Sequence, residues 1–68
     1  MENKIFLDML YKKYQSALLS KIQAARELNI SRATLDRLRN DGEIKSQKLG
    51  KGIRFNIHEI ARIVLSKS

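Results

Sequence analysis

The chain has 68 residues, of which 14 are Lys or Arg and 7 are Asp or Glu, so its formal net charge is +7. A chain of this length forms one domain that buries about 60% of its unfolded surface, which leaves little room for a deep enzyme pocket. There is no cysteine and one histidine, which excludes disulfides and thiolate metal sites and leaves too few ligands for most zinc sites. With no nucleophile–base pair, paired carboxylates or glycine-rich phosphate loop, we expect neither enzyme activity nor a cofactor.

The positive charge lies mainly in the second part of the chain. Residues 1–20 carry three lysines and two acids, a net of +1, which leaves +6 for residues 21–68. Residues 45–54 contain four cations and no acid, a pattern that attracts polyanions such as nucleic acid or an anionic membrane. No apolar run approaches the ~20 residues of a membrane span, and the N-terminal stretch lacks the basic start of a signal peptide. We therefore expect a cytoplasmic protein.

Residues 1–18 are expected to form an N-terminal helix. Its apolar face, at helical spacing, consists of Leu7, Leu10, Tyr11, Tyr14, Ala17 and Leu18. This spacing places both tyrosines in the core. Three further apolar residues, Ile5, Phe6 and Met9, fall beside that face. They predict either contacts between copies of the chain or loose packing of the terminal helix.

A second helix is expected at residues 21–28. Ser20 and Gln23 have the spacing of a capping box, in which each side chain satisfies a backbone N–H at the helix start. Asn29 follows the helix and tolerates positive φ, so it can turn the chain sharply. The buried face of this helix is expected to contain Ile22, Ala25 and Leu28.

A third helix is expected at about residues 32–40, with Ser31 as its N-cap and Gly42 as its stop. Two short helices joined by a tight turn, the second of them basic, are typical of a helix-turn-helix, here over residues 20–40. Leu35 and Leu38 would face the core. Helical geometry then turns Arg32, Ala33, Asp36 and Arg37 outward.

The period of the pattern changes after Ile44. Apolar residues then alternate with polar ones, and Gly50-Lys51-Gly52 can close a hairpin between residues 44–49 and 53–56. We call this hairpin the wing, with expected bounds 44–56. Asn56 and Glu59 have the spacing of another capping box, which would start a closing helix at residues 57–66. His58 lies in its first turn, and without partner ligands it is assigned no metal role.

Two stretches, "LLSKIQAARELNISRATLDRLRNDGEI" and "LGKGIRFNIHEIARIVL", resemble the excisionase-type and MerR-like (AlpA-like) winged helix-turn-helix DNA-binding domains. The resemblance implies a mainly α fold with a small β-hairpin, that is, a winged helix-turn-helix with an extra N-terminal helix. It also implies that the third helix reads the major groove of double-stranded DNA while the wing lies against the minor groove and backbone. The positions it implicates are Ser31, Arg32, Ala33, Thr34, Asp36 and Arg37 in the recognition helix and Lys48, Lys51 and Arg54 in the wing. Asp36, where many relatives have a base, and Ile53, in place of a frequent aromatic, depart from the family pattern.

The resemblance further implies a small excisionase (recombination directionality factor) or a transcriptional regulator of a phage or bacterial mobile element. Its expected protein partner is an integrase or other recombinase, or RNA polymerase. Too few residues follow the wing for an effector domain, so a stand-alone role on the nucleoid is expected. Two other functions stay open: a protein-interaction module that presents its basic face to an acidic partner, and a single-strand binder that stacks bases on Tyr11 and Tyr14.

Overall fold

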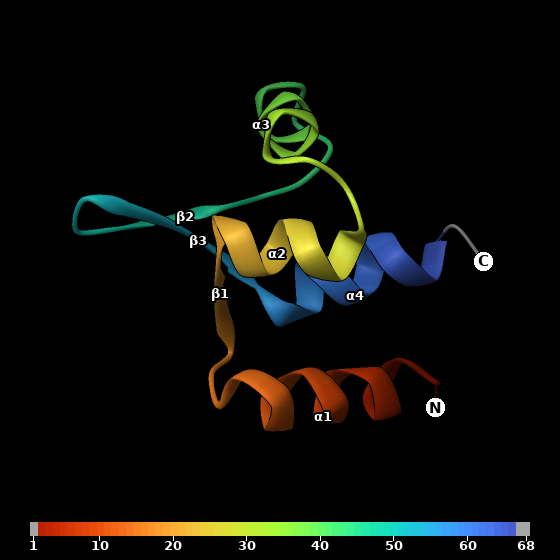
Figure 1. Cartoon of the computed structure of the whole chain (residues 1–68). Coiled ribbons are helices and arrows are strands. Elements are labelled where there is room, and N and C mark those ends of the chain that lie inside the picture. Colours follow the sequence, from red (N-terminus) through yellow and green to blue (C-terminus); the bar gives the residue numbers. More distant parts are fainter. Residues whose placement is uncertain (1, 67–68) are drawn as a thin grey trace.

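The computed structural model describes residues 2–66, with side chains from residue 4 on, and consists of four helices and a small antiparallel sheet (Figure 1). This confirms the expected fold class. The helix α1 lies along α4, α2 lies between α4 and α3, and the β2–β3 hairpin projects away from the helices (Figure 1). The elements are α1 (Glu2–Tyr14), β1 (Leu18–Ser20), α2 (Lys21–Leu28), α3 (Arg32–Asn40), β2 (Gln47–Leu49), β3 (Gly52–Asn56) and α4 (Ile57–Ser66).

The sheet has three strands in the order β1-β3-β2, one more than the sequence predicted. The strand β1 pairs antiparallel with β3, so that Leu19 lies opposite Phe55, and both side chains are buried. The backbone N–H of Ile57 continues this pairing by donating to the carbonyl of Ala17 at 2.9 Å. The wing, which the structure bounds at residues 47–56, is therefore fixed at its base to the segment that precedes α2.

The predicted N-terminal helix was too long, because α1 ends at Tyr14. Gln15 adopts φ 55, a left-handed conformation that takes the chain out of the helix. The Ser16 hydroxyl then accepts a hydrogen bond from the Leu18 backbone N–H at 3.0 Å. Leu18, expected on the helix face, is instead the first residue of β1.

The buried face of α1 also differs from the predicted one. Leu10 is buried as expected, but Tyr11 is 54% exposed, so its assignment to the core was wrong. Phe6, expected to be spare, packs against the core beside Leu7 and Tyr14. Ile5 and Met9 are exposed, at 62% and 60%. The exposed apolar side chains of α1 are thus Ile5, Met9 and Tyr11, and Phe6 does not belong to them.

The caps of the helix-turn-helix match the sequence. Gln23 N–H donates to Ser20 Oγ at 3.2 Å while Ser20 N–H donates to Gln23 Oε1 at 3.0 Å, which completes the capping box. Asn29 has φ 57, as its place after α2 predicts. Ser31 caps α3 by accepting from the Thr34 N–H at 3.1 Å.

The structure corrects two predictions about the packing of the helix-turn-helix, one for Ile22 and one for Ile44. Ile22 is 55% exposed and does not belong to the buried face of α2, which is formed by Ala24 and Ala25. Two adjacent alanines allow the backbone of α2 to approach its neighbours closely. Ile44 was predicted to begin a strand, but it lies in the connection between α3 and β2. Its side chain is 1% exposed and forms part of the core.

The start of α4 differs from the predicted capping box. Asn56 Oδ1 accepts from the His58 N–H at 2.8 Å, but the Glu59 side chain does not return to Asn56. It accepts instead from the backbone N–H of Lys45 at 2.8 Å and pairs with Arg62. The core that these elements enclose is formed by Leu10, Leu19, Ala24, Ala25, Leu35, Ile44, Phe55, Ile57, Ile60 and Ile63.

Candidate nucleic-acid interface

A surface groove of about 440 Å³ lies where the start of α2, the start of α3 and the wing meet. We call it the basic groove, because four of its lining residues are cations and none is an acid. Its lining residues are Ser20, Lys21, Ile22, Arg32, Lys51, Ile53 and Arg54. Three elements far apart in the sequence thus bring positive charge to one concave surface, where a polyanion would be held by several cations at once.

The α3 helix presents its predicted outward face beside this groove. Leu35 is fully buried and fixes the rotation of the helix. Arg32, Ala33 and Arg37 are exposed as a consequence. Of these, Arg32 lines the basic groove, while Arg37 lies about 1.4 turns further along the helix. Arg37 takes part in no ion pair among the described residues, so its guanidinium is available to a ligand.

The N-terminal end of α3 carries two hydroxyl groups in contact. The Ser31 hydroxyl donates to Thr34 Oγ1 at 2.9 Å while it accepts from the Thr34 backbone N–H. Backbone N–H groups at a helix start favour anions, because the helix dipole is positive there. A phosphate beside Arg32 would therefore meet a favourable potential from both the helix end and the side chain.

Asp36 is tied to cations on two helices and is half-buried. Its Oδ1 lies 2.8 Å from Lys21 Nζ on α2 and 3.9 Å from Arg39 Nη2, one turn along α3. Lys21 is the main cause that lowers the pKa of the Asp36 carboxyl below its ordinary value. The negative charge of Asp36 is thus largely compensated within the motif.

Lys21 is the functional candidate that sequence reasoning missed. It lines the basic groove and links α2 to α3 through Asp36. The signal that could have found it is its position. A cation in the first turn of a helix is unfavourable toward the helix dipole, and α2 has no acid in that turn to offset it. Such a residue is expected to have a partner outside its own helix.

The wing brings two of its three predicted contact residues into the basic groove. Lys51, in the turn, is exposed, and Arg54, on β3, is half-buried, with its Nη1 donating to the carbonyl of Ile53 at 3.0 Å. Both line the groove. Lys48 is exposed on β2 but does not line the basic groove. It therefore adds positive charge to the wing outside the groove that Arg32 lines.

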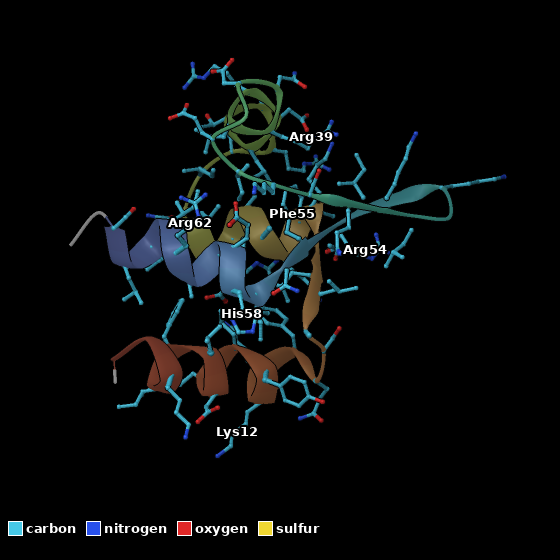
Figure 2. All side chains as sticks on the ribbon, turned by 180° about the vertical axis from the view of Figure 1, so that it is seen from behind. Lys12, Arg39, Arg54, Phe55, His58 and Arg62 are labelled. Atoms are coloured by element: carbon cyan, nitrogen blue, oxygen red, sulfur yellow. The ribbon has the colours of Figure 1, made fainter. Side chains whose placement is uncertain are left out.

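An ion pair on α4 fixes the segment that connects α3 to the wing. Glu59 pairs with Arg62 at 2.8 Å and accepts from the Lys45 N–H, and Arg62 also donates to the carbonyl of Glu43 at 2.9 Å. These contacts, with Arg62 first, lower the pKa of the Glu59 carboxyl from 4.5 to about 2. Figure 2 shows Arg62 on α4 and Arg54 on the wing, with Phe55 between them. The segment that leads into the wing is therefore held from α4, while β3 of the wing pairs with β1.

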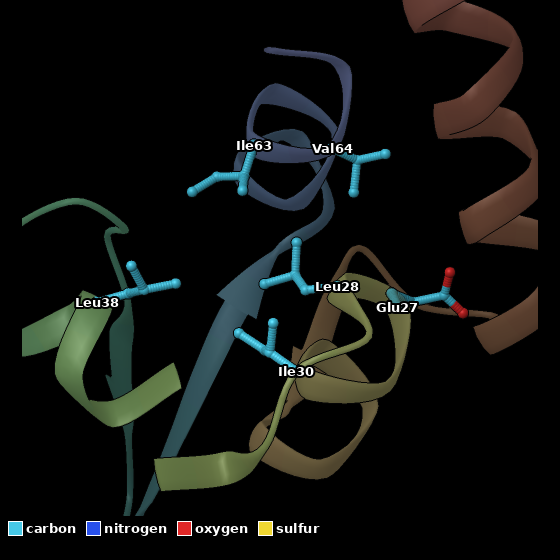
Figure 3. A pocket seen from close by; sticks show the side chains of 6 residues that line it. All are labelled: Glu27, Leu28, Ile30, Leu38, Ile63 and Val64. Atoms are coloured by element: carbon cyan, nitrogen blue, oxygen red, sulfur yellow. The ribbon is translucent and has the colours of Figure 1, made fainter. Parts of the chain in front are cut away.

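A second hollow of about 180 Å³ lies on α2, the turn, α3 and α4 (Figure 3). Its lining is apolar except for Glu27 at one edge, and the apolar side chains are Leu28, Ile30, Leu38, Ile63 and Val64. The Glu27 carboxylate is engaged by α1, since it pairs with Lys13 at 2.7 Å and accepts from the Tyr14 hydroxyl. Most of these side chains are half-buried, so the hollow lies at the margin of the core, and it lacks the positive charge of the basic groove.

Two further findings concern the described part of the chain. Residues 2–66 hold no group of three or more His, Cys, Asp or Glu side chains placed to bind a metal ion. Within the same residues, no helix combines the length and the apolarity that a membrane crossing requires.

Comparison with known proteins agrees with the geometry. Residues 18–68, more than half of the chain, match the family model described as a helix-turn-helix domain. The chain belongs to this helix-turn-helix domain family. No curated protein and no solved structure matches it significantly. The match begins at β1, so α1 is an addition in front of the helix-turn-helix domain. Membership supports DNA binding and suggests a non-enzymatic protein.

Proposed function

We propose that this helix-turn-helix domain binds double-stranded DNA sequence-specifically, as a winged type similar to the excisionase-type and MerR-like (AlpA-like) domains. One observation carries the proposal: the basic groove joins the start of α3 to the wing through Lys21, Arg32, Lys51 and Arg54. Cations that serve only to keep a surface hydrated need not lie together, because like charges repel each other and are more stable when water separates them. A DNA backbone that passes between α3 and the wing would contact all three elements.

The chemistry of α3 suits the major groove. An α-helix fits that groove, and an arginine there can bond O6 and N7 of one guanine together. Arg37, which is exposed and takes part in no ion pair in the described chain, is the strongest candidate for such a contact. Ala33 exposes only a methyl group, which suits contact with a thymine methyl. Ser31 and Thr34, at the helix start, are placed for phosphate.

The wing supplies the second contact. Lys51 and Arg54 would hold phosphate on the far side of the basic groove, with Lys48 adding charge along β2. Phosphate contacts position a protein on the duplex but carry no sequence information. We therefore assign base reading to α3 and positioning to the wing.

The role that fits this chemistry is a small excisionase or a transcriptional regulator of a mobile genetic element, acting in the cytoplasm of a bacterium. Its support is the resemblance of the motif and wing to those families. A recombinase or RNA polymerase would be the protein partner. Copies placed side by side could also meet through Ile5 and Met9 on α1, both of which are exposed.

The test is selection of a binding site from a random duplex library, followed by competition and salt titration. Affinity should fall with salt by about one log unit per log unit for each phosphate neutralised, and the selected duplex should outcompete random duplex. Salt-dependent binding without preference for any selected duplex would contradict sequence-specific recognition. Failure to bind duplex, together with capture of acidic peptides on the same groove, would favour the protein-interaction function.

The single-strand function receives no support from the tyrosines. Tyr14 is half-buried and its hydroxyl donates to Glu27. Tyr11 is exposed, but it lies on α1 and does not line the basic groove. A stacking surface needs aromatic faces along the path of the backbone.

A further inference from the structure

The tip of the wing exposes one large apolar side chain. Leu49, the last residue of β2, is 50% exposed. It pairs with Gly52, which has no side chain to cover it, and only Gly50 and Lys51 separate the two strands. The core does not use Leu49, since it is absent from the buried cluster and from the residues packed against it. The fold therefore does not account for a leucine at this position.

Cations lie on both faces of the hairpin near this leucine. Lys48 precedes it on β2 and therefore points to the opposite face, Lys51 follows in the turn, and both are exposed. The Arg54 guanidinium lies over Gly52, because a Cβ on that glycine would come within 2.7 Å of Arg54 Nη1. Side chains two apart in a strand share a face, so Leu49, opposite Gly52, shares the face of Arg54. An apolar side chain among cations complements a polyanion with an apolar interior.

DNA has that combination, since stacked bases lie between two charged backbones. Proteins use β-ribbons in either groove of the duplex, and the glycines at positions 50 and 52 leave Leu49 and Lys51 as the only bulky side chains at this tip. Leucine is among the side chains that minor-groove proteins insert between base steps, which unstacks the step and bends the duplex. Because Lys51 and Arg54 also line the basic groove, the tip extends the same surface.

We propose that Leu49 inserts from the minor groove between two base pairs and unstacks them. This inference rests on the proposed DNA binding, and it assigns to Leu49 the role of a wedge, that is, a side chain inserted between base pairs. The cations beside Leu49 hold the two backbones while the leucine replaces the lost stacking contact with its own apolar surface. The bound duplex is consequently bent away from the wing, toward the major groove.

The experiment compares wild type, Leu49→Ala, Leu49→Met and Lys51→Ala on the selected duplex. All changed side chains are exposed, and circular dichroism checks that each variant folds. Permanganate oxidises unstacked thymines, so it maps unstacking on duplexes in which successive positions carry thymine. All reactions are run at protein concentrations that saturate the duplex, so that affinity does not affect the pattern. Circularly permuted fragments report the bend.

We expect wild type to make one step hyperreactive, several-fold above free duplex, at the edge of its footprint. Leu49→Met should keep this signal and the bend, and Leu49→Ala should lose both while still saturating the duplex. Lys51→Ala should bind more weakly but keep the hyperreactive step at saturation.

Two sets of results would overturn the inference while leaving DNA binding intact: an unreactive footprint for wild type, or equal reactivity with Leu49→Ala. Leu49-dependent binding to vesicles of anionic lipid, without a hyperreactive step on DNA, would assign the wing tip to a membrane surface instead. If wild type binds no duplex at all, both the proposed function and the wedge fail.

Discussion

Lys21 Nζ and Asp36 Oδ1 lie 2.8 Å apart, so that the first residue of α2 is bound to the middle of α3 at the edge of the basic groove. The pair links the two helices of the motif at their surface, in addition to the packing of Leu35 in the core. It also places one negative charge next to the path that we assign to DNA. The Asp36 carboxylate therefore weakens the attraction of the motif for the phosphates of any DNA duplex, including duplexes that lack the selected site.

The first prediction follows from this pair. Asp36→Asn removes the negative charge and releases Lys21 and Arg39, so affinity for random duplex should rise several-fold, and more than affinity for the selected site. The salt slope should steepen by up to about one, because Lys21 becomes free to neutralise a phosphate. Fluorescence anisotropy at several salt concentrations measures both. The control is Asp8→Asn, which changes the same charge on α1; equal effects of the two variants would show that only net charge matters.

The second prediction separates base reading from positioning. Arg37→Ala should cost ~1–3 kcal/mol on the selected site and little on random duplex, whereas Lys51→Ala should weaken both and flatten the salt slope by about one. Competition binding on the two duplexes provides the comparison. If Arg37→Ala loses affinity equally on both, Arg37 contacts phosphate and another residue reads the base.

The third prediction concerns the turn of the motif. Asn29 holds φ 57, a region that glycine enters freely and a β-branched residue enters with strain. Asn29→Gly should leave thermal stability nearly unchanged, while Asn29→Val should lower it by ~1–3 kcal/mol. Urea unfolding followed by circular dichroism measures the difference, and a valine variant as stable as wild type would contradict this account of the turn.

The fourth prediction concerns acid stability. The Glu59 carboxylate is bound by Arg62 and the Lys45 N–H only in the folded state, which lowers its pKa from 4.5 to about 2. Its contribution is therefore complete above pH 4.5 and is lost as the pH falls from 4.5 to about 2. We expect about 1–2 kcal/mol over this range, after allowance for solvent screening.

Unfolding by urea at stepped pH tests this window. Glu59→Gln, which keeps an acceptor but no charge, should be less stable at neutral pH and should lose less stability across the window. The matched control is Glu43→Gln, whose exposed side chain forms no ion pair in the described chain. An acid transition that Glu59→Gln leaves unaltered would assign the acid sensitivity to other carboxyls.

The fifth prediction tests contacts between copies. A single module of this kind buries ~600–1,000 Å² on DNA, which seldom gives regulatory specificity alone. On duplexes with one, two or three sites, wild type should bind cooperatively, and an Ile5→Ser, Met9→Ser variant should bind the same sites independently. Phe6 is left unchanged because it packs against the core. Cooperativity that survives in the variant would move the contact to the wing.

Much of the motif followed from the sequence because its signals are local. The capping box of Ser20 and Gln23, the positive φ of Asn29 and the N-cap Ser31 each depend on chemistry within three residues. The buried Leu35 then sets the outward face of α3 through helical geometry alone. The wing turn was equally clear from its glycines, although Gly52 belongs to β3 and not to the turn.

The features that the sequence could not predict depend on contacts between segments that lie far apart in the sequence. A strand of three residues such as β1 is too short to show a period, and Leu18 also matched the helix spacing of α1. Apolar residues occur on most sides of α1, so only its packing against α4 determines that Phe6 is covered and Tyr11 exposed. Lys21 likewise becomes part of the groove only when β3 and α3 approach it.

The pairing of β1 with β3 also shapes how the domain folds. Residues 18–20 and 54–56 meet in the sheet, and both helices of the motif and the wing turn lie on the chain between them. Closing so long a loop costs chain entropy before any contact compensates for it. The local helices can form early, but the ladder between Leu19 and Phe55 requires the whole intervening chain to be in place. The motif and the wing consequently form one cooperative unit, and damage to either is expected to lower the stability of both.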